Sequence, residues 1–227
     1  MFSVPFIGVD ENGWQLNSCV SGDLTAGSTS DDGDFIDIWD PSTEGYETWY
    51  YRSLTSGNSW RNPEKRTEKF EDVHEDGLPA GTAFWYYSQS ETASVAFNFA
   101  GAVDPADDAE IAVTGSQYNM FANPYPVAFK LNEASQVDWS NVTAGATTDD
   151  GDFIDIWDPS TEGYETWYYR SLTSGNSWRN PEKRTEKFED VHEDGLPVGT
   201  AFWYFAQGSD ATITFNSPLK KTTSTEE

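Results

Sequence analysis

The sequence predicts an all-β protein made of two tandem, homologous modules of antiparallel strands. The main observation is a duplication, because the segment 31–79 recurs without a change as 149–197. The shift of 118 residues, from 31 to 149, is close to the commonest domain size. Apolar residues also alternate over short stretches bounded by Gly, Pro, Asn and Asp, a pattern typical of strands joined by turns. Each module is expected to be sandwich-like or barrel-like, and the duplication allows a pseudo-twofold pairing of the two.

The points where the copies diverge set the expected boundaries. We expect one module at 1–103, a linker at 104–108, a second module at 109–217 and a polar tail at 218–227. The start of the chain resembles the segment that begins at Met120, but the apolar stretch Ile111–Val113 before it has no counterpart in the first copy. We therefore expect that the first module lacks its N-terminal strand and that the chain is cut from a longer precursor.

The repeated segment begins with the clearest hairpin of the chain. Before it, 1–29 contains short apolar patches broken by turn residues. In the stretch 34–39, Ile36 and Ile38 share one face while Phe35, Asp37 and Trp39 share the other. The residues 40–45 contain Pro41 and Gly45 and predict a turn, in which Gly45 can take a positive φ. The aromatic stretch 46–52 then returns as a second strand.

The rest of each module is predicted less uniquely. Residues 53–58 form a turn, and 61–76 either starts a helix at Asn62-Pro63 or contains an edge strand at 70–73. Strands follow at 82–87 and 93–99. Tyr87, Val95 and Phe97 are replaced by Phe205, Ile213 and Phe215 in the second copy, so we expect these positions to face the core. Side chains alternate along the strand 82–87, so Trp85 should face the core together with Tyr87. Phe84 and Tyr86 should then point to the opposite face of the sheet.

Charge and composition exclude several classes of partner. Acidic residues outnumber Lys and Arg by 39 to 13, for a formal net charge of −26. Such a chain repels nucleic acid and anionic lipid. We interpret the charge as a source of solubility, with cation binding or partner steering as the alternative. No apolar run is long enough to suggest a membrane-spanning helix and no signal peptide is recognised. Cys19 is the one cysteine, which excludes an internal disulfide and is expected to be a buried thiol.

The second copy follows a recognisable pattern. Its opening Tyr118–Pro126, its middle Gly151–Pro159 with Tyr164, and its closing Leu196–Trp203 resemble uncharacterised tandem β-repeat domains of large secreted or surface proteins of environmental bacteria. In those domains an NPYP opening, a D-x-I-x-x-W-(D/N)-P hairpin and a P-G-x-A-F-W strand recur. In the first copy the match begins at about Asp31. The resemblance implies an extracellular or cell-surface β module, and it brings no catalytic residues with it.

Two groups of residues are candidates for ligand binding. Clustered carboxylates suit Ca²⁺, although their spacing is not that of an EF-hand loop, and an acidic solvated loop explains them equally. These are Asp31, Asp32 and Asp34, with Asp149, Asp150 and Asp152. Aromatic rings stack on sugars, although they also form sheet cores. These are Trp39, Trp49 and Trp60, with Trp157, Trp167 and Trp178, accompanied by Tyr51 and Tyr169.

No constellation predicts catalysis. His74 and His192 are the two histidines, in equivalent charged segments, and we expect both to be exposed to solvent. The chain has no Gly-x-Ser-x-Gly motif, no phosphate loop and no Cys/His metal cluster. We therefore predict that it is not an enzyme and needs no cofactor, with calcium as the one alternative considered.

The sequence thus predicts a non-enzymatic structural or adhesive repeat module that associates with like modules or other surface proteins through its sheet edges. The alternative is a carbohydrate-binding module with two equivalent aromatic sites for a polysaccharide. The structural interpretation buries Trp39 and Trp60, whereas the carbohydrate-binding interpretation exposes them. The divergent flanks argue against an artificial concatenated sequence.

Overall fold

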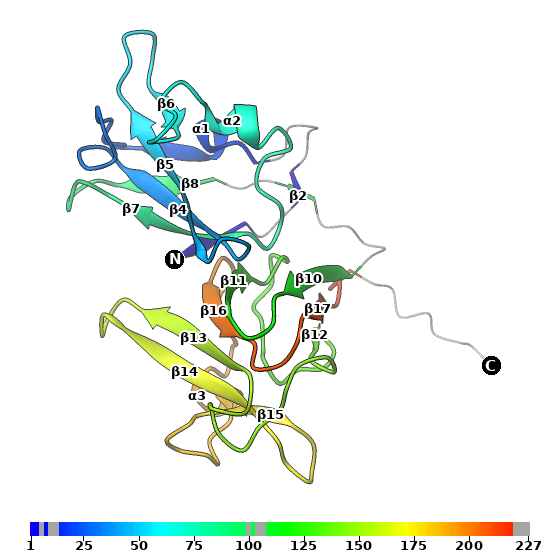
Figure 1. Cartoon of the computed structure of the whole chain (residues 1–227). Helices are drawn as coiled ribbons and strands as arrows, with labels where there is room; N and C mark the ends of the chain where they lie inside the picture. Colours follow the sequence, from blue (N-terminus) through cyan, green and yellow to red (C-terminus); the bar gives the residue numbers. More distant parts are fainter. Residues whose placement is uncertain (5–6, 9–13, 99–100, 103–107, 220–227) are drawn as a thin grey trace. The chain divides into compact units, whose positions relative to one another are not determined.

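The computed structural model describes residues 1–4, 7–8, 14–98, 101–102 and 108–219. Strands dominate, and the named strand pairs are antiparallel, which confirms the predicted all-β class (Figure 1). In the part of the chain that the structure describes, no sheet closes into a barrel. The predicted linker lies outside the described residues except for Asp108, and so does the predicted tail from residue 220 onward.

The contacts divide the chain into two compact units. The first contains Met1–Ala102 together with the short segments Met120–Ala122 and Gly199–Ala201. The second contains Val103–Asn119, Asn123–Val198 and Phe202–Glu227. The module boundaries predicted from the sequence stay predictions.

The first large sheet has five strands in the order β1-β7-β4-β5-β6. These strands are β1 (Phe2–Ser3), β7 (Ala83–Tyr87), β4 (Phe35–Asp40), β5 (Gly45–Arg52) and β6 (Ser59–Arg61). Two strand pairs accompany it, namely β2 (Ile7–Gly8) with β9 (Gly101–Ala102) and β3 (Val20–Gly22) with β8 (Val95–Phe97). Two four-residue helices, α1 (Leu16–Cys19) and α2 (Phe70–Val73), complete this set of elements.

The second five-stranded sheet repeats this order as β11-β16-β13-β14-β15. Its strands are β11 (Tyr118–Ala122), β16 (Ala201–Phe205), β13 (Phe153–Asp158), β14 (Gly163–Arg170) and β15 (Ser177–Arg179). A three-stranded sheet follows in the order β10-β17-β12, from β10 (Ala109–Val113), β17 (Ala211–Phe215) and β12 (Val137–Asp138). The helix α3 (Phe188–Val191) matches α2.

The predicted hairpin is present in both copies, with one difference in its turn. In the first copy β4 pairs with β5 from Phe35 opposite Tyr50 to Asp40 opposite Gly45. The residue with a positive φ is Glu44, at 49°, and not Gly45. Asp40 stabilises the turn, because its Oδ1 accepts the backbone N–H and the hydroxyl of Ser42. The turn is therefore held by a side chain rather than by glycine at the expected position.

The segment 61–76 matches neither alternative predicted for it. After β6 ends at Arg61, the side chain of Asn62 accepts the backbone N–H groups of Glu64 and Lys65 and closes a turn instead of starting a helix. The helix begins at Phe70, where a strand was the alternative. Asp72 accepts the backbone N–H of Lys69 and caps its first turn. The helix is held by Phe70, whose side chain is fully buried.

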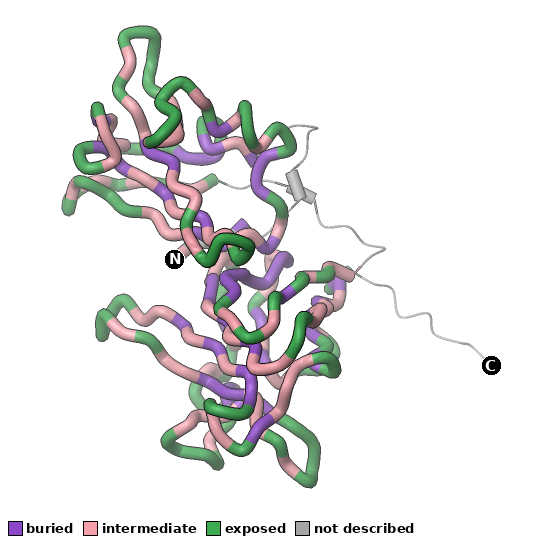
Figure 2. The backbone as a smooth tube through the Cα atoms, in the orientation of Figure 1, coloured by how far each residue is buried: buried purple, intermediate pink, exposed green. Residues whose placement is uncertain are grey.

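The core lies on the inner face of each large sheet. Ile36 and Ile38 are buried, as their alternation predicts, together with Trp49 of β5 and Trp60 of β6. Figure 2 colours the buried stretches of the chain purple. Opposite them, the strands β3 and β8 form part of a second layer, in which Phe97 contacts the ring of Phe84 at a centroid distance of 5.3 Å.

The prediction of which side chains of β7 face the core is wrong. Ile38 lies opposite Phe84 and Ile36 lies opposite Tyr86, so these two aromatic side chains share the inner face. Phe84 is fully buried, whereas Tyr87 is 44 % exposed and Trp85 is half-buried on the outer face. The exchange of Tyr87 for Phe205 misled the prediction, because an apolar exchange is also tolerated on an outer face that is itself aromatic.

Candidate functional site

The outer face of the first large sheet carries a cluster of aromatic side chains. The strand register sets two rows, with Phe35 of β4 next to Tyr87 of β7, and Trp39 of β4 opposite Tyr46 of β5. Between the rows, Asp37 lies opposite Trp85 on one side and Thr48 on the other. We call this surface the outer aromatic face; its members are Phe35, Asp37, Trp39, Tyr46, Thr48, Trp85 and Tyr87.

Ring contacts hold these side chains in place. Phe35 stacks on Tyr87 with their centroids 4.4 Å apart, and Trp39 meets Tyr46 edge-on at 5.2 Å. Trp85 lies 6.4 Å from Tyr87. Neighbouring rings on one sheet face therefore support each other, which reduces the conformational entropy that a ligand would have to remove.

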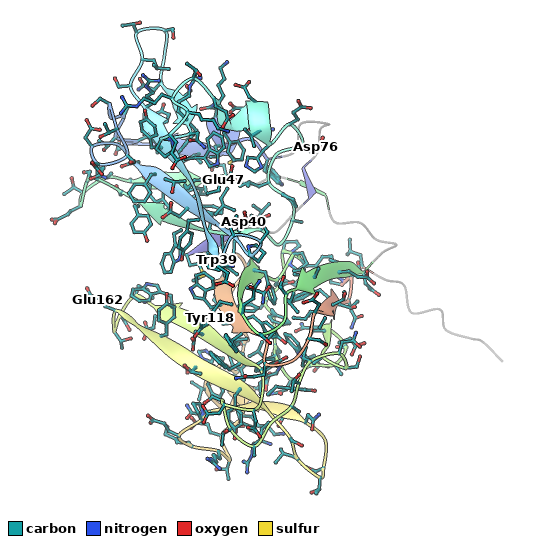
Figure 3. The ribbon with its side chains drawn as sticks, in the orientation of Figure 1. Trp39, Asp40, Glu47, Asp76, Tyr118 and Glu162 are labelled. Carbon is teal, nitrogen blue, oxygen red and sulfur yellow. The ribbon has the colours of Figure 1, made fainter. Side chains whose placement is uncertain are left out.

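The face is accessible despite these contacts. Tyr46 is 46 % exposed and Tyr87 is 44 % exposed, while Trp39 and Trp85 are half-buried. No Lys or Arg belongs to the set. Figure 3 labels Trp39 and Asp40, which adjoin at the end of β4, and Glu47 on the neighbouring strand.

The polar centre of the face is the carboxyl group of Asp37. Its Oδ1 accepts the hydroxyl of Thr48 at 2.5 Å. Partial burial among the rings raises the pKa of Asp37 above its ordinary value, and the Thr48 hydrogen bond opposes this shift without cancelling it. The arrangement combines ring faces for apolar contact with one fixed hydrogen-bond acceptor, which is how protein sites orient an amphipathic ligand.

The second copy presents the same face. Its members are Phe153, Asp155, Trp157, Tyr164, Thr166, Trp203 and Phe205. Phe153 stacks on Phe205 at 5.2 Å and Trp157 meets Tyr164 at 5.1 Å. Tyr164 is 48 % exposed. Partial burial likewise raises the pKa of Asp155, which accepts the hydroxyl of Thr166.

Tyr118 of β11 enlarges the face of the second copy. Its ring, labelled in Figure 3, is 41 % exposed. The ring centroid lies 4.9 Å from that of Phe205 and 5.9 Å from that of Trp203. Burial raises the pKa of its phenol, and the negative charge of Asp155 raises it further. The hydroxyl of Tyr118 thus remains a hydrogen-bond donor at neutral pH and lies within the electrostatic reach of the central carboxylate.

The structure corrects most of the predicted sugar-stacking residues. Four of the six tryptophans have no exposed surface, namely Trp49, Trp60, Trp167 and Trp178. They lie on the inner face, where Trp49 packs on Phe70 of α2 and Trp167 packs on Phe188 of α3. A ring without exposed surface cannot stack on a ligand. Of the six, Trp39 and Trp157 belong to the outer aromatic faces.

The sequence does contain a signal that places Phe35 and Tyr46 on the outer face. Because Ile36 and Ile38 mark the inner face, Phe35 and Trp39 must point outward, and a turn at 40–45 sets Tyr46 opposite Trp39. The position of Trp85 needed the register between β4 and β7, which no local pattern supplies.

The predicted calcium-binding carboxylates have structural tasks instead. Asp34 is fully buried and accepts hydrogen bonds from the backbone N–H groups of Thr25 and Gln89 and from the hydroxyl of Tyr86. Asp32 accepts both the N–H and the hydroxyl of Thr29, and these bonds hold its pKa well below the ordinary range. Both oxygens of each carboxylate therefore accept hydrogen bonds from within the protein, those of Ser28 reaching Oδ2 of Asp32.

The second copy uses its aspartates in the same way. Asp152 is buried and accepts hydrogen bonds from Thr143, Tyr204 and Gln207, while Asp150 accepts those of Ala146 and Thr147. Across the described ranges, no group of three His, Cys, Asp or Glu side chains is placed to hold a metal ion. The aspartate loops, with Asp31 and Asp149 at their exposed tips, thus fasten the sheet ends.

The histidines were predicted to be exposed, but both are only partly exposed. His74 lies 3.0 Å from the carboxylate of Glu47 through its Nε2 and stacks on Phe70, and His192 pairs in the same way with Glu165. The sides of these imidazoles are covered by the helix and by Trp49 or Trp167. Each pair joins a helix end to the hairpin, which is a structural role.

A hollow adjoins the outer aromatic face of the first copy. It has a volume of about 270 Å³ and lies beside Tyr46 and Thr48. Asp40, Glu47 and Glu64 are among its lining residues, and the carboxylate of Glu47 is paired with His74. Hydrogen bonds from Ser42 lower the pKa of Asp40, so this group is ionised at neutral pH. The negative charge of the face thus extends beyond Asp37.

Cys19 is buried, as predicted. Burial raises the pKa of its thiol to about 12, so the reactive thiolate form is disfavoured at neutral pH. None of the helices in the described part of the chain has the length and apolar character needed to cross a bilayer.

Comparisons with known proteins give no family. A scan against protein-family models finds no match, and searches of the curated proteins and of the solved structures find none either. The function must therefore be argued from the geometry.

Proposed function

We propose that the chain is a non-enzymatic adhesive repeat protein in which each copy binds polysaccharide through its outer aromatic face. The observation that supports this proposal is the array of partly exposed rings around one carboxylate, present twice with the same register. Sugar rings have apolar C–H faces and a polar rim of hydroxyls. Stacked aromatics match the first and the carboxylate, phenol and threonine hydroxyl groups match the second. We further propose that it works outside the cell or at its surface, where such polymers are found.

The experiment is a glycan-array screen together with pull-down on insoluble polysaccharides. Two double variants remove the face in both copies: Trp39→Ala with Trp157→Ala, and Tyr46→Ala with Tyr164→Ala. The tyrosine pair is the more exposed, so its loss disturbs folding less. The control pair is Val73→Ala with Val191→Ala, which removes exposed apolar side chains of α2 and α3 outside the face.

We expect the wild-type chain and the valine control to bind, and both aromatic variants to lose binding while keeping the far-UV circular dichroism of the wild type. Absence of glycan binding by the wild type would falsify the proposal. Equal binding by all variants would do the same, because the ligand would then sit elsewhere.

A second function, association between copies of the chain, is favoured by the edge of β8. In the second copy β10 pairs along the whole of β17, and Ile213 and Phe215 are fully buried. Their counterparts Val95 and Phe97 remain half-buried, because β8 is paired with β3 alone among the described strands. An open strand edge with apolar side chains accepts a further strand, and we propose that a second copy supplies it.

Sedimentation velocity over a range of concentrations tests this second function. Ala96 is exposed in the middle of β8, and Ala96→Lys places a charge on the edge. The matched control is Ser56→Lys, in an exposed loop. A dimer that Ala96→Lys weakens and Ser56→Lys preserves supports association through β8; a monomer at every concentration rejects it.

A further inference from the structure

The position of the central carboxylate on each outer aromatic face limits which ligands the face can bind. Asp37 lies between Phe35 and Trp39 along β4 and between Trp85 and Thr48 across the sheet. Thr48 is the donor that the structure gives to this carboxylate among the described residues, and it occupies Oδ1. A ligand that rests on the rings therefore meets Oδ2 as its hydrogen-bond acceptor.

Acidic residues adjoin this carboxylate, and the register places the nearest basic residue of the sheet face, Arg61 of β6, beyond Thr48, opposite Tyr50. None of the seven residues of the face is basic, and the adjoining hollow adds Asp40 and Glu64, whereas the carboxylate of Glu47 is paired with His74. With a formal net charge of −26, the chain as a whole repels uronic-acid or sulfated polymers and attracts cations. Ring faces attract ammonium groups in addition, through the cation–π interaction.

We propose that the outer aromatic faces bind a cationic polysaccharide, an amino-sugar polymer with free amines, and that Asp37 and Asp155 each pair with one ammonium group. This inference rests on the proposed function and specifies its ligand. The pyranose C–H faces lie on the rings, and the ammonium group donates to Oδ2 of the central aspartate. An N-acetylated sugar offers the same stacking surface without the charge.

The electrostatic cost of the carboxylate supports this assignment. The folded chain holds Asp37 and Asp155 where partial burial disfavours their ionised form. An asparagine would keep the acceptor for the threonine hydroxyl without that cost. An ionisable group at a position where burial disfavours its charged form is typical of functional sites. A cationic ligand would compensate for the cost of ionising the carboxylate.

Calorimetric titration with a glucosamine oligomer and an N-acetylglucosamine oligomer of equal length tests the proposal, at a pH where the amines are protonated. The test variant is Asp37→Asn with Asp155→Asn. The control is Asp76→Asn with Asp194→Asn, an exposed pair at equivalent positions that changes the net charge by the same amount. Asp76 is labelled in Figure 3.

We expect the wild type to bind the free-amine oligomer about tenfold more tightly than the acetylated one, as one charge-assisted hydrogen bond allows. Asp37→Asn with Asp155→Asn should abolish this preference, and the control should keep it. Equal binding of both oligomers by the wild type overturns the inference and leaves the proposed function standing. An equal loss in the control overturns it too, because bulk charge then explains the preference. Binding of neither oligomer, nor of any glycan on the array, rejects both proposals.

Discussion

Tyr86 donates its phenolic hydroxyl to Oδ2 of Asp34 across 2.7 Å, although the two residues lie 52 positions apart. The second copy has the same bond between Tyr204 and Asp152. Each bond joins β7 or β16 to the aspartate loop that precedes the hairpin. It lies at the inner side of the sheet, so it positions the strand whose other side carries the outer aromatic face.

Removing this hydroxyl should destabilise the fold. Tyr86→Phe and Tyr204→Phe each leave a buried carboxylate short of one donor, which costs about 1–3 kcal/mol. Tyr204→Phe should cost more, because Tyr204 is fully buried and Tyr86 is not. Urea unfolding followed by tryptophan fluorescence measures both, with Tyr164→Phe, an exposed phenol, as the control. A loss no larger than that of the control would show that water replaces the bond.

The same bond predicts a dependence on alkaline pH. Burial, together with the nearby aspartate, raises the pKa of Tyr86 and Tyr204 well above the ordinary value of 10.0. A raised folded-state pKa gives stability that is complete below 10.0 and is lost as pH rises toward the folded pKa. The stability gap between the wild type and Tyr204→Phe should therefore narrow above pH 10.0. A gap of constant size across that pH range would contradict the assignment.

The central aspartates should show a pH dependence of the same sign, but at acidic pH. Since the folded pKa of Asp37 and Asp155 is raised above 3.8, the folded state binds more protons than the unfolded state in the window above 3.8, and stability falls as pH rises through it. Asp37→Asn with Asp155→Asn should thus be more stable than the wild type at pH 7 and lose this advantage near pH 3.8. Urea midpoints at both values measure the difference, and a less stable variant at pH 7 contradicts it.

Truncation of equivalent phenylalanines should differ between the copies. Phe215→Ala removes a fully buried ring beneath β10 and should cost about 3–5 kcal/mol. Phe97→Ala removes a half-buried ring and should cost less than half as much. Each variant is the control of the other in urea unfolding. Equal costs would mean that a further strand already covers β8 in solution.

The two faces should bind independently. Calorimetric titration with a short oligomer should give two sites per chain for the wild type and one for either Trp39→Ala or Trp157→Ala. The segments that supply β4–β5 and β13–β14 are identical, but Tyr118 adds a ring to the second face alone. Trp39→Ala, which keeps the second face, should therefore bind more tightly than Trp157→Ala. A stoichiometry of one in the wild type would show that only one copy is competent, and the contribution of Tyr118 would then identify which.

The sequence predicted the hairpin and its inner face because both depend on neighbouring residues. Ile36 and Ile38 alternate with polar and aromatic residues. The short turn between 40 and 45 allows only antiparallel pairing of the two strands that it joins. The fold class followed from the same signals.

The outer face could not be predicted in full, because it depends on pairing between distant strands. Trp85 joins the face through the register of β7 with β4, which is set by Phe84 packing into the core. The aspartates misled for a related reason. From the local sequence their loop resembles a cation site. The donors that bind Asp34 belong to Tyr86 and Gln89, which lie more than fifty positions away in the chain.

The identity of the two hairpins also bears on how the chain reaches its native state. During refolding, β4–β5 and β13–β14 carry the same side chains, so each can pair with the strand β7 or β16 of either copy. Native pairing closes the shorter loop, which favours it entropically, and Tyr87 and Phe205 offer little chemical discrimination. A fraction of chains with exchanged hairpins is therefore expected after rapid dilution from denaturant, and resolving them requires breaking the pairing between each hairpin and the strand of the other copy. The duplication thus creates a kinetically trapped species with exchanged hairpins. This species would not form if one copy folded before the other.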